Sequence, residues 1–110
     1  MYVNSVVLVG NLTKDPEAGK PDNGVVANFR VAVDNQRKDD DGNVVSGRVD
    51  FVDAEVWGAQ AQHCLDSLKK GSRVIVVGPL LLDQWTDGEG NARSKHKVKV
   101  RVIGRSLEFA

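Results

Sequence analysis

Short runs of alternating apolar and polar residues, rich in valine, dominate this sequence of 110 residues. Nineteen residues are Val, and β-branched side chains favour strands over helices. Five runs show the period of two that is typical of strands with one buried face. They cover residues 3–12, 25–34, 50–57, 73–85 and 95–103. Pro79 in the fourth run cannot donate a ladder hydrogen bond, so we expect a bulge or an edge position there.

One segment has a helical period instead, and it lies between the third and fourth runs. Its apolar residues are Ala61, Cys64, Leu65 and Leu68, which recur at the spacing of one helix face. Gly71 follows two lysines, as a C-cap glycine often does. We therefore expect one short helix between the third and fourth strands.

The order of three strands, a helix and two strands predicts an all-β chain of the OB-fold type. This fold is a five-stranded Greek-key barrel, and the face of its second and third strands commonly binds oligonucleotides or oligosaccharides. The turn-rich residues 87–91 predict a long hairpin between the last two strands, and loops are expected at 13–24 and 37–47. The length predicts a single domain over residues 1–110.

Aromatic residues fall on a face that the alternation predicts to be polar. In run 50–57, Phe51 and Trp57 share the outward side with Asp53 and Glu55. Trp85 precedes the turn of the last hairpin. Tryptophan is usually a core residue, so core packing is the alternative. Exposed aromatic rings can instead stack on nucleic-acid bases, which contributes about 1–3 kcal/mol per base.

The chain has a formal net charge of zero, with 15 basic and 15 acidic residues, but these charges are unevenly distributed. A basic stripe runs along one side of the last strand. Its members are Lys95, Lys97, Lys99 and Arg101, opposite His96, Val98, Val100 and Val102. Residues 1–90 carry nine basic and fourteen acidic side chains, whereas residues 91–110 carry six basic and one acidic. The stripe suits a phosphate backbone, although a solvated edge strand protected by lysine is the alternative.

No catalytic residue, metal or cofactor is expected. Three consecutive aspartates at 39–41 suggest a calcium loop, but the EF-hand frame places Arg37 and Arg48 at ligand positions. Cys64 is the only cysteine, which excludes an intramolecular disulfide. The N-terminus lacks a secretion signal and no stretch approaches 18 apolar residues, so a cytoplasmic protein without a membrane span is expected.

The sequence resembles the bacterial single-stranded DNA-binding protein family over nearly its whole length. The matching stretches are residues 4–12 (NSVVLVGNL), 15–17 (DPE), 24–32 (GVVANFRVA), 51–58 (FVDAEVWG), 68–74 (LKKGSRV) and 85–91 (WTDGEGN). The resemblance implies an OB-fold that assembles as a homotetramer and does no catalysis. It also implies binding of single-stranded DNA with little sequence preference, in replication, recombination and repair at the bacterial nucleoid.

Matched by position, Phe51, Trp57 and Trp85 resemble the base-stacking aromatics of this family, although the first is usually Trp and the second often Phe. Arg37 stands where the family often has another Trp, and Asp53 stands where it often has Arg. The residues expected to contact the DNA backbone are Arg30, Arg37, Lys70, Arg73, Arg93, Lys95, Lys97, Lys99 and Arg101.

Two alternatives stay open at this stage. Asp53 and Glu55 on the binding face favour an OB-fold protein-interaction subunit of a replication or primosome complex, with weak DNA binding. Stacking also does not distinguish DNA from RNA. Family members commonly continue into an acidic tip that recruits replication and repair proteins; this sequence ends at Ala110, so those partners are not expected.

Overall fold

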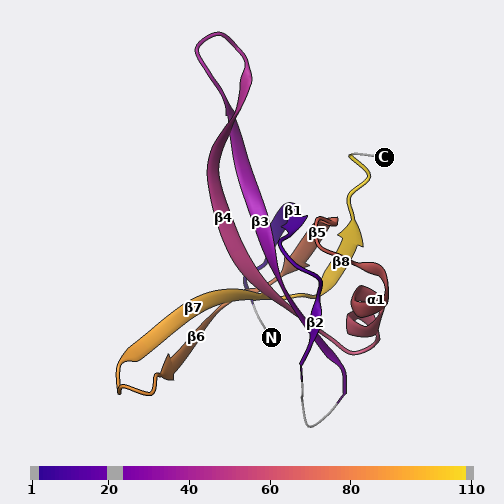
Figure 1. Ribbon diagram of the computed structural model, residues 1–110, viewed down its shortest axis with the longest axis vertical. Helices are drawn as coiled ribbons and strands as arrows, with labels where there is room; N and C mark the ends of the chain where they lie inside the picture. Colours follow the sequence, from indigo (N-terminus) through magenta and orange to yellow (C-terminus); the bar gives the residue numbers. More distant parts are fainter. Residues whose placement is uncertain (1–2, 20–23, 109–110) are drawn as a thin grey trace.

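The computed structural model of the chain describes residues 3–19 and 24–108, which form eight strands and one helix. In chain order they are β1 (Val6–Leu12), β2 (Glu17–Ala18), β3 (Val26–Lys38), β4 (Val44–Trp57), α1 (Ala59–Ser67), β5 (Arg73–Gly78), β6 (Leu80–Thr86), β7 (Ala92–Lys99) and β8 (Val102–Arg105). Two long hairpins, β3–β4 and β6–β7, extend from a central body in different directions (Figure 1).

All the strands belong to one curled sheet. Its order is β6-β7-β4-β3-β1-β5-β8, with β2 paired to β3. The two ends of this path are joined through the chain, because β5 leads into β6 at Pro79 and β7 leads into β8 through Val100 and Arg101. The N–H of Lys99 donates to the carbonyl of Pro79 at 3.1 Å, and that of Arg101 to Val77 at 2.8 Å. The sheet therefore closes on itself, as the predicted Greek-key barrel requires.

The core fills the inside of this barrel with inward-facing side chains from alternate strand positions. The largest fully buried side chains are Val31, Val56, Val74, Val76 and Val98. Ala61 and Cys64 of α1 complete the cluster. Full burial of a valine contributes about 1.5–3 kcal/mol, so the valine-rich alternation supplies the main stabilisation of the fold.

Helix α1 forms where its period predicted it, but its end differs from the expectation. The helix stops at Ser67, and Leu68 is already extended with a ψ of 149°. Gly71 is therefore not the C-cap. It has a φ of +88° and forms the turn that leads into β5, where its N–H donates to the carbonyl of Leu12 at 2.8 Å.

The loop predicted at 37–47 is reduced to a turn at residues 39–43, because β3 and β4 stay paired almost to their ends. The register continues to Lys38 opposite Val44. One Asp39 carboxylate oxygen accepts hydrogen bonds from two backbone N–H groups of the turn, and Gly42 supplies a φ of +84°. Asp, Asn and Gly favour long loops and tight hairpin turns alike. The other predicted loop, 13–24, contains the short strand β2 in its described part.

The fourth and fifth predicted strands are each divided in two. Pro79 separates β5 from β6, and the chain changes strand partners at Val100 and Arg101. This change reverses which side chains face inward. Val102 was expected on the inner side but is 54% exposed, while Ile103 packs against the core.

Gly78, at the end of β5, lies against the backbone at the end of β7, and this contact should not tolerate a larger residue. A Cβ at this position would lie 2.2 Å from the backbone oxygen of Lys99. Gly78→Ala is therefore expected to lower the free energy of unfolding by about 1–3 kcal/mol. Urea denaturation followed by circular dichroism measures the change. Gly104→Ala in β8 is the matched control, because a Cβ there meets no atom within 4 Å, and equal midpoints for the two variants would contradict the prediction.

Candidate nucleic-acid interface

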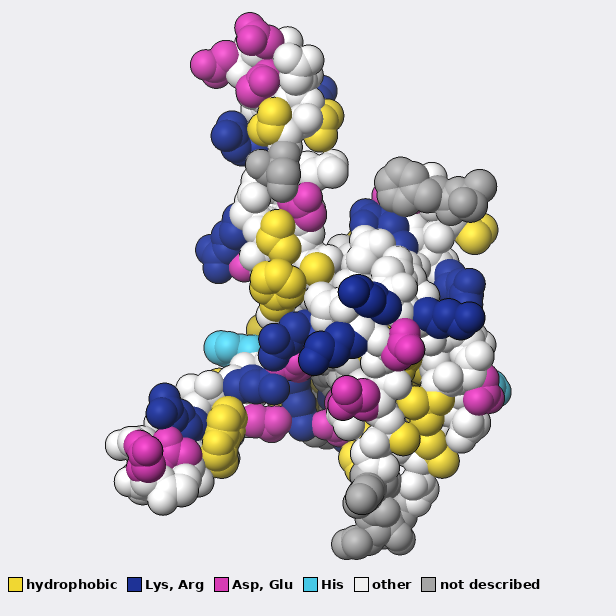
Figure 2. All heavy atoms as spheres, in the orientation of Figure 1, with side chains coloured by type: hydrophobic (Ala, Val, Ile, Leu, Met, Phe, Trp, Pro, Cys, Tyr) yellow, Lys and Arg dark blue, Asp and Glu magenta, His cyan; other side chains and the backbone are white. Residues whose placement is uncertain are grey.

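Four neighbouring strands, β3, β4, β7 and β6, present one continuous outward face. The register pairs Arg30 with Asp53, Asp53 with Lys97, and Lys97 with Leu81. Directly paired residues point to the same side of a sheet, so outward side chains of all four strands share this surface. Figure 2 shows Lys and Arg side chains interleaved with Asp and Glu where the β6–β7 hairpin meets the body.

The three predicted stacking aromatics are all exposed. Phe51 is 62% exposed, Trp57 42% and Trp85 46%, so none of them is packed in the core. Phe51 and Trp57 lie on the outward side of β4, as the alternation predicted, and Trp85 lies on the same side of β6. The Trp57 indole Nε1–H donates to the Glu55 carboxylate, which holds the ring against this face.

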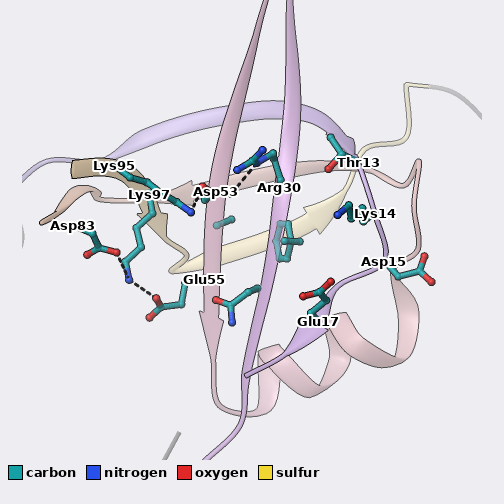
Figure 3. A pocket seen from close by; sticks show the side chains of 13 residues that line it. Thr13, Lys14, Asp15, Glu17, Arg30, Asp53, Glu55, Asp83, Lys95 and Lys97 are labelled. Carbon is teal, nitrogen blue, oxygen red and sulfur yellow. Dashed lines mark hydrogen bonds and ion pairs between the residues drawn. The ribbon is translucent and has the colours of Figure 1, made fainter. Parts of the chain in front are cut away.

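A row of ion pairs centred on Asp53 crosses the face (Figure 3). Its carboxylate lies 3.0 Å from Nε of Arg30 in β3 and 2.8 Å from Nζ of Lys95 in β7. Partial burial alone would raise the pKa of Asp53. The hydrogen bonds and positive charges of Arg30 and Lys95 outweigh burial, so the pKa lies below its ordinary value. At neutral pH this row therefore has two cations around one anion.

A second row has the opposite arrangement, with Lys97 between two carboxylates. Its Nζ lies 2.5 Å from Glu55 and 3.0 Å from Asp83 of β6. The hydrogen bond to Glu55 is the main reason why the pKa of Lys97 is raised. Burial would raise the pKa of Glu55, but Lys97 and Trp57 outweigh it and lower that pKa. The two rows together hold three cations and three anions, and so are electrically neutral.

A groove of about 450 Å³ runs beside these rows (Figure 3). Its lining includes four basic side chains, Lys14, Arg30, Lys95 and Lys97, and five acidic ones, Asp15, Glu17, Asp53, Glu55 and Asp83. Thr13 and Asn28 also line it. The lining residues of segment 13–17 were not predicted, because this segment has no periodicity and was expected to be a loop.

The far end of the β6–β7 hairpin carries a separate aromatic and basic pair. Trp85 and Arg93 are direct partners in the register, and both line a shallow hollow. Arg93 Nε lies 2.8 Å from a carboxylate oxygen of Asp87. The other oxygen of Asp87 accepts the N–H groups of Glu89 and Asn91, both at 2.9 Å, which fixes the turn beside the ring. The hydrogen bond from Arg93 is the largest cause of the lowered pKa of Asp87.

The remaining predicted cations are spread around the barrel. Lys99 follows Lys97 on the outward side of β7, and Arg101 lies beyond the end of that strand. Lys70 is not part of the groove lining, but its backbone N–H donates to the carboxylate of Asp15, which is. Arg37 lies near the tip of the β3–β4 hairpin.

Arg73 belongs to a different part of the barrel. It begins β5, which does not neighbour the four strands of this face. Its guanidinium lies 3.0 Å from Glu108 and donates to Asn11 at 2.8 Å. The structure therefore brings Arg30, Lys95, Lys97 and Lys99 together, and leaves Arg37 and Arg73 away from them.

Residues 3–19 and 24–108 contain neither a cluster of metal ligands nor a membrane-spanning helix. In that part of the chain, no group of three or more His, Cys, Asp or Glu side chains could hold a metal ion. The single helix found there is neither long nor apolar enough to cross a membrane. Cys64 is buried, and burial raises the pKa of its thiol, which disfavours the reactive thiolate.

Comparison with known proteins identifies the family. The sequence model of the protein family described as "Single-strand binding protein family" matches residues 3–106. The chain belongs to this family. Its structure is similar to the crystal structure of a small single-stranded DNA-binding protein from Streptomyces coelicolor, with a TM-score of 0.84, 26% identity and 97% of each chain covered. The OB-fold predicted from the order of elements is thereby confirmed.

Curated relatives agree with this membership. The single-stranded DNA-binding protein of Wolinella succinogenes is 41% identical over 104 residues, which are 94% of this chain and 63% of the relative. The protein of the same name from Mycolicibacterium smegmatis is 38% identical over 108 residues, 96% of this chain and 66% of the relative. The chain thus spans less than two thirds of the length of these two relatives.

The lowered pKa of Asp53 predicts a specific loss of stability in acid. A carboxylate whose pKa is lower in the folded than in the unfolded state stabilises the fold above its ordinary pKa, and this contribution is lost as the pH falls through the folded value. Asp53→Asn removes it. The difference in unfolding free energy between wild type and Asp53→Asn should therefore be at its maximum above about pH 5 and should decline below about pH 4.

Urea denaturation at several pH values between 3 and 7 measures this difference. Asp40→Asn is the matched control, because it makes the same chemical change at an exposed position of the β3–β4 turn. A difference for Asp53→Asn that stays constant over the whole range would refute the stabilising role of this row.

Proposed function

We propose that the chain binds single-stranded DNA without sequence preference and has no catalytic role. The observation that carries the proposal is the exposure of Phe51, Trp57 and Trp85 on the same side of the sheet as Lys95 and Lys97. Single strands offer unstacked bases and phosphates together, and this surface offers aromatic rings and cations together. The names of the family and of its relatives support the same ligand.

Base stacking is the sequence-independent part of the proposed mechanism. Every base has a π-face, and each base–aromatic stack contributes about 1–3 kcal/mol. Phe51 and Trp57 are six residues apart on one strand, which separates them by about 20 Å. A single strand that follows β4 would therefore meet both rings, and Trp85 on the neighbouring hairpin extends the path.

Cations on the same surface are proposed to hold the DNA backbone. Arg30, Lys95, Lys97 and Lys99 flank the aromatic path, and Arg93 lies opposite Trp85. The more distant cations contribute only where DNA continues around the barrel; these are Arg37, Lys70, Arg73 and Arg101. Contacts to phosphate add affinity that falls with salt but carry no sequence information.

We further propose that the chain assembles with copies of itself, as a homotetramer. The outer surface of β1, β5 and β8 is apolar, since the register pairs Val7 with Val77 and Val77 with Val102. Val7 is 65% exposed, Val102 54% and the nearby Ile75 37%. Contiguous exposed apolar residues on a small domain mark an interaction surface. Assembly would cover this patch and leave the DNA face open.

The biological setting is part of the proposal. Protection of single-stranded DNA in replication, recombination and repair follows from the proposed ligand, with the bacterial cytoplasm and nucleoid as the location. The competing function is a protein-interaction subunit that touches DNA weakly, and the electrical neutrality of the two ion-pair rows favours it. Weak binding to both oligo-dT and duplex DNA would select that alternative.

The two tryptophans allow a direct test, because the chain contains no other tryptophan. Oligo-dT is expected to quench their fluorescence on stacking, and the affinity should fall as salt rises. Trp57→Ala and Trp85→Ala should each cost about 1–3 kcal/mol of binding free energy. Fluorescence titration, or anisotropy of a labelled oligonucleotide, measures both effects.

Matched variants separate stacking from general loss of structure. Trp57→Phe and Trp85→Phe keep a stacking ring and leave one tryptophan each, so they should bind nearly as the wild type does and show which ring is quenched. Leu82→Ala truncates an exposed apolar residue that alternates to the other side of β6, and it should leave the affinity unchanged. Unchanged affinity in both Trp→Ala variants would argue against the stacking mechanism.

Charged substitutions in the proposed assembly surface should lower the mass of the assembly. Val7→Glu and Val102→Glu place charges in the apolar patch and should shift the chain from tetramer towards smaller species in sedimentation analysis, because burying an unpaired charge is costly. Val44→Glu, at an equally exposed position near the β3–β4 turn, is the control and should leave the mass unchanged. A monomeric wild-type chain would refute the homotetramer.

A further inference from the structure

We propose that the carboxylates of Asp53, Glu55 and Asp83 compete with DNA phosphates for the cations of this face, and so make it select single strands over duplex DNA. The inference rests on the proposed function, and it assigns a specificity role to three residues that repel the ligand.

The cations of the two ion-pair rows already have partners. Arg30 and Lys95 lie within 3.0 Å of Asp53, and Lys97 lies within 3.0 Å of both Glu55 and Asp83. A phosphate that approaches these groups must displace a carboxylate or accept its repulsion. Each exchange replaces one anion by another, so the net electrostatic gain is small.

Duplex and single-stranded DNA differ in the contacts that they offer to this face. Sequence-independent binding to duplex DNA comes almost entirely from phosphate contacts and the release of counterions. A single strand adds base stacking, which does not depend on the charge of the protein surface. Because the cations of the two ion-pair rows are already neutralised by carboxylates, they add little to duplex binding, whereas binding of the single strand keeps its stacking contribution.

The rings of Trp57 and Trp85 lie beside the same carboxylates. Glu55 accepts the indole N–H of Trp57 while it pairs with Lys97, and Asp83 lies two residues before Trp85 on the same side of β6. The adjoining groove has one more acidic than basic side chain in its lining. A polyanion without accessible bases thus meets no excess of positive charge near the stacking rings.

The experiment compares Asp53→Asn, Glu55→Gln and Asp83→Asn with the wild type, each binding an oligo-dT and a hairpin duplex of equal charge over a salt series. Asp66→Asn is the control, because it makes the same charge change on α1, where Asp66 accepts a hydrogen bond from Gln62. Thermal melting accompanies each variant. The side chain of Asp83 is 46% exposed and, among residues 3–19 and 24–108, forms an ion pair with Lys97 alone, so its substitution disturbs the fold least.

The face variants should bind duplex more tightly, and the preference for oligo-dT should fall by about threefold to tenfold. The slope of log K against log salt should steepen by about 0.7 for oligo-dT and 0.9 for duplex per cation released. Asp66→Asn should change both affinities less than twofold and leave their ratio unchanged.

The outcomes separate this inference from the proposed function. Wild-type protein that fails to bind oligo-dT refutes the proposed function itself. Wild-type protein that binds oligo-dT, with face variants whose preference and salt slopes are unchanged, overturns the competition and leaves the function standing. Carboxylates with a purely structural role would instead give variants with lower melting temperatures, weaker oligo-dT binding and unaltered salt slopes, which also overturns the inference.

Discussion

The short parallel pairing of β4 with β7 is the contact on which both the barrel and its outer face depend. It joins only three residue pairs, from Asp53 opposite Lys97 to Glu55 opposite Lys99. The paired residues are more than forty positions apart in the sequence. Their contact must therefore offset a large loop-closure entropy. The buried Ala54 and Val98, which are direct partners inside this ladder, supply hydrophobic contact at the same place.

One ladder therefore serves two purposes through simple alternation. Its inward residues close the barrel core, and its outward residues bring two carboxylates against two lysines. A one-residue slip would turn Val98 outward and the lysines inward, at a high cost in both hydrophobic burial and charge desolvation. The ion-pair rows are thus fixed by the same register that fixes the core, and Trp57 is held beside them by Glu55.

The contrast between what the sequence predicted and what it missed follows from the range of the interactions. Alternation within one strand is local, so the outward placement of Phe51 and Trp57 and the order of the elements were predicted correctly. The pairing of Asp53 with Lys95 depends on which distant strands become neighbours, and no periodicity encodes that. Val102 was misplaced for a related reason: the chain changes partners between Val100 and Arg101, which reverses the alternation.

The ion-pair rows show how the zero net charge of the chain is distributed in space. The basic excess of residues 91–110 and the acidic excess of residues 1–90 are not separate surfaces, because the β4–β7 pairing brings members of both together within hydrogen-bonding distance. A strongly basic OB face would bind any polyanion through counterion release. A face whose cations are matched by its own carboxylates leaves the exposed rings as its main source of affinity, and rings can bind only bases that are free to stack. In the function proposed for this chain, charge matching and aromatic exposure therefore act together, since either one alone would give weak or indiscriminate binding.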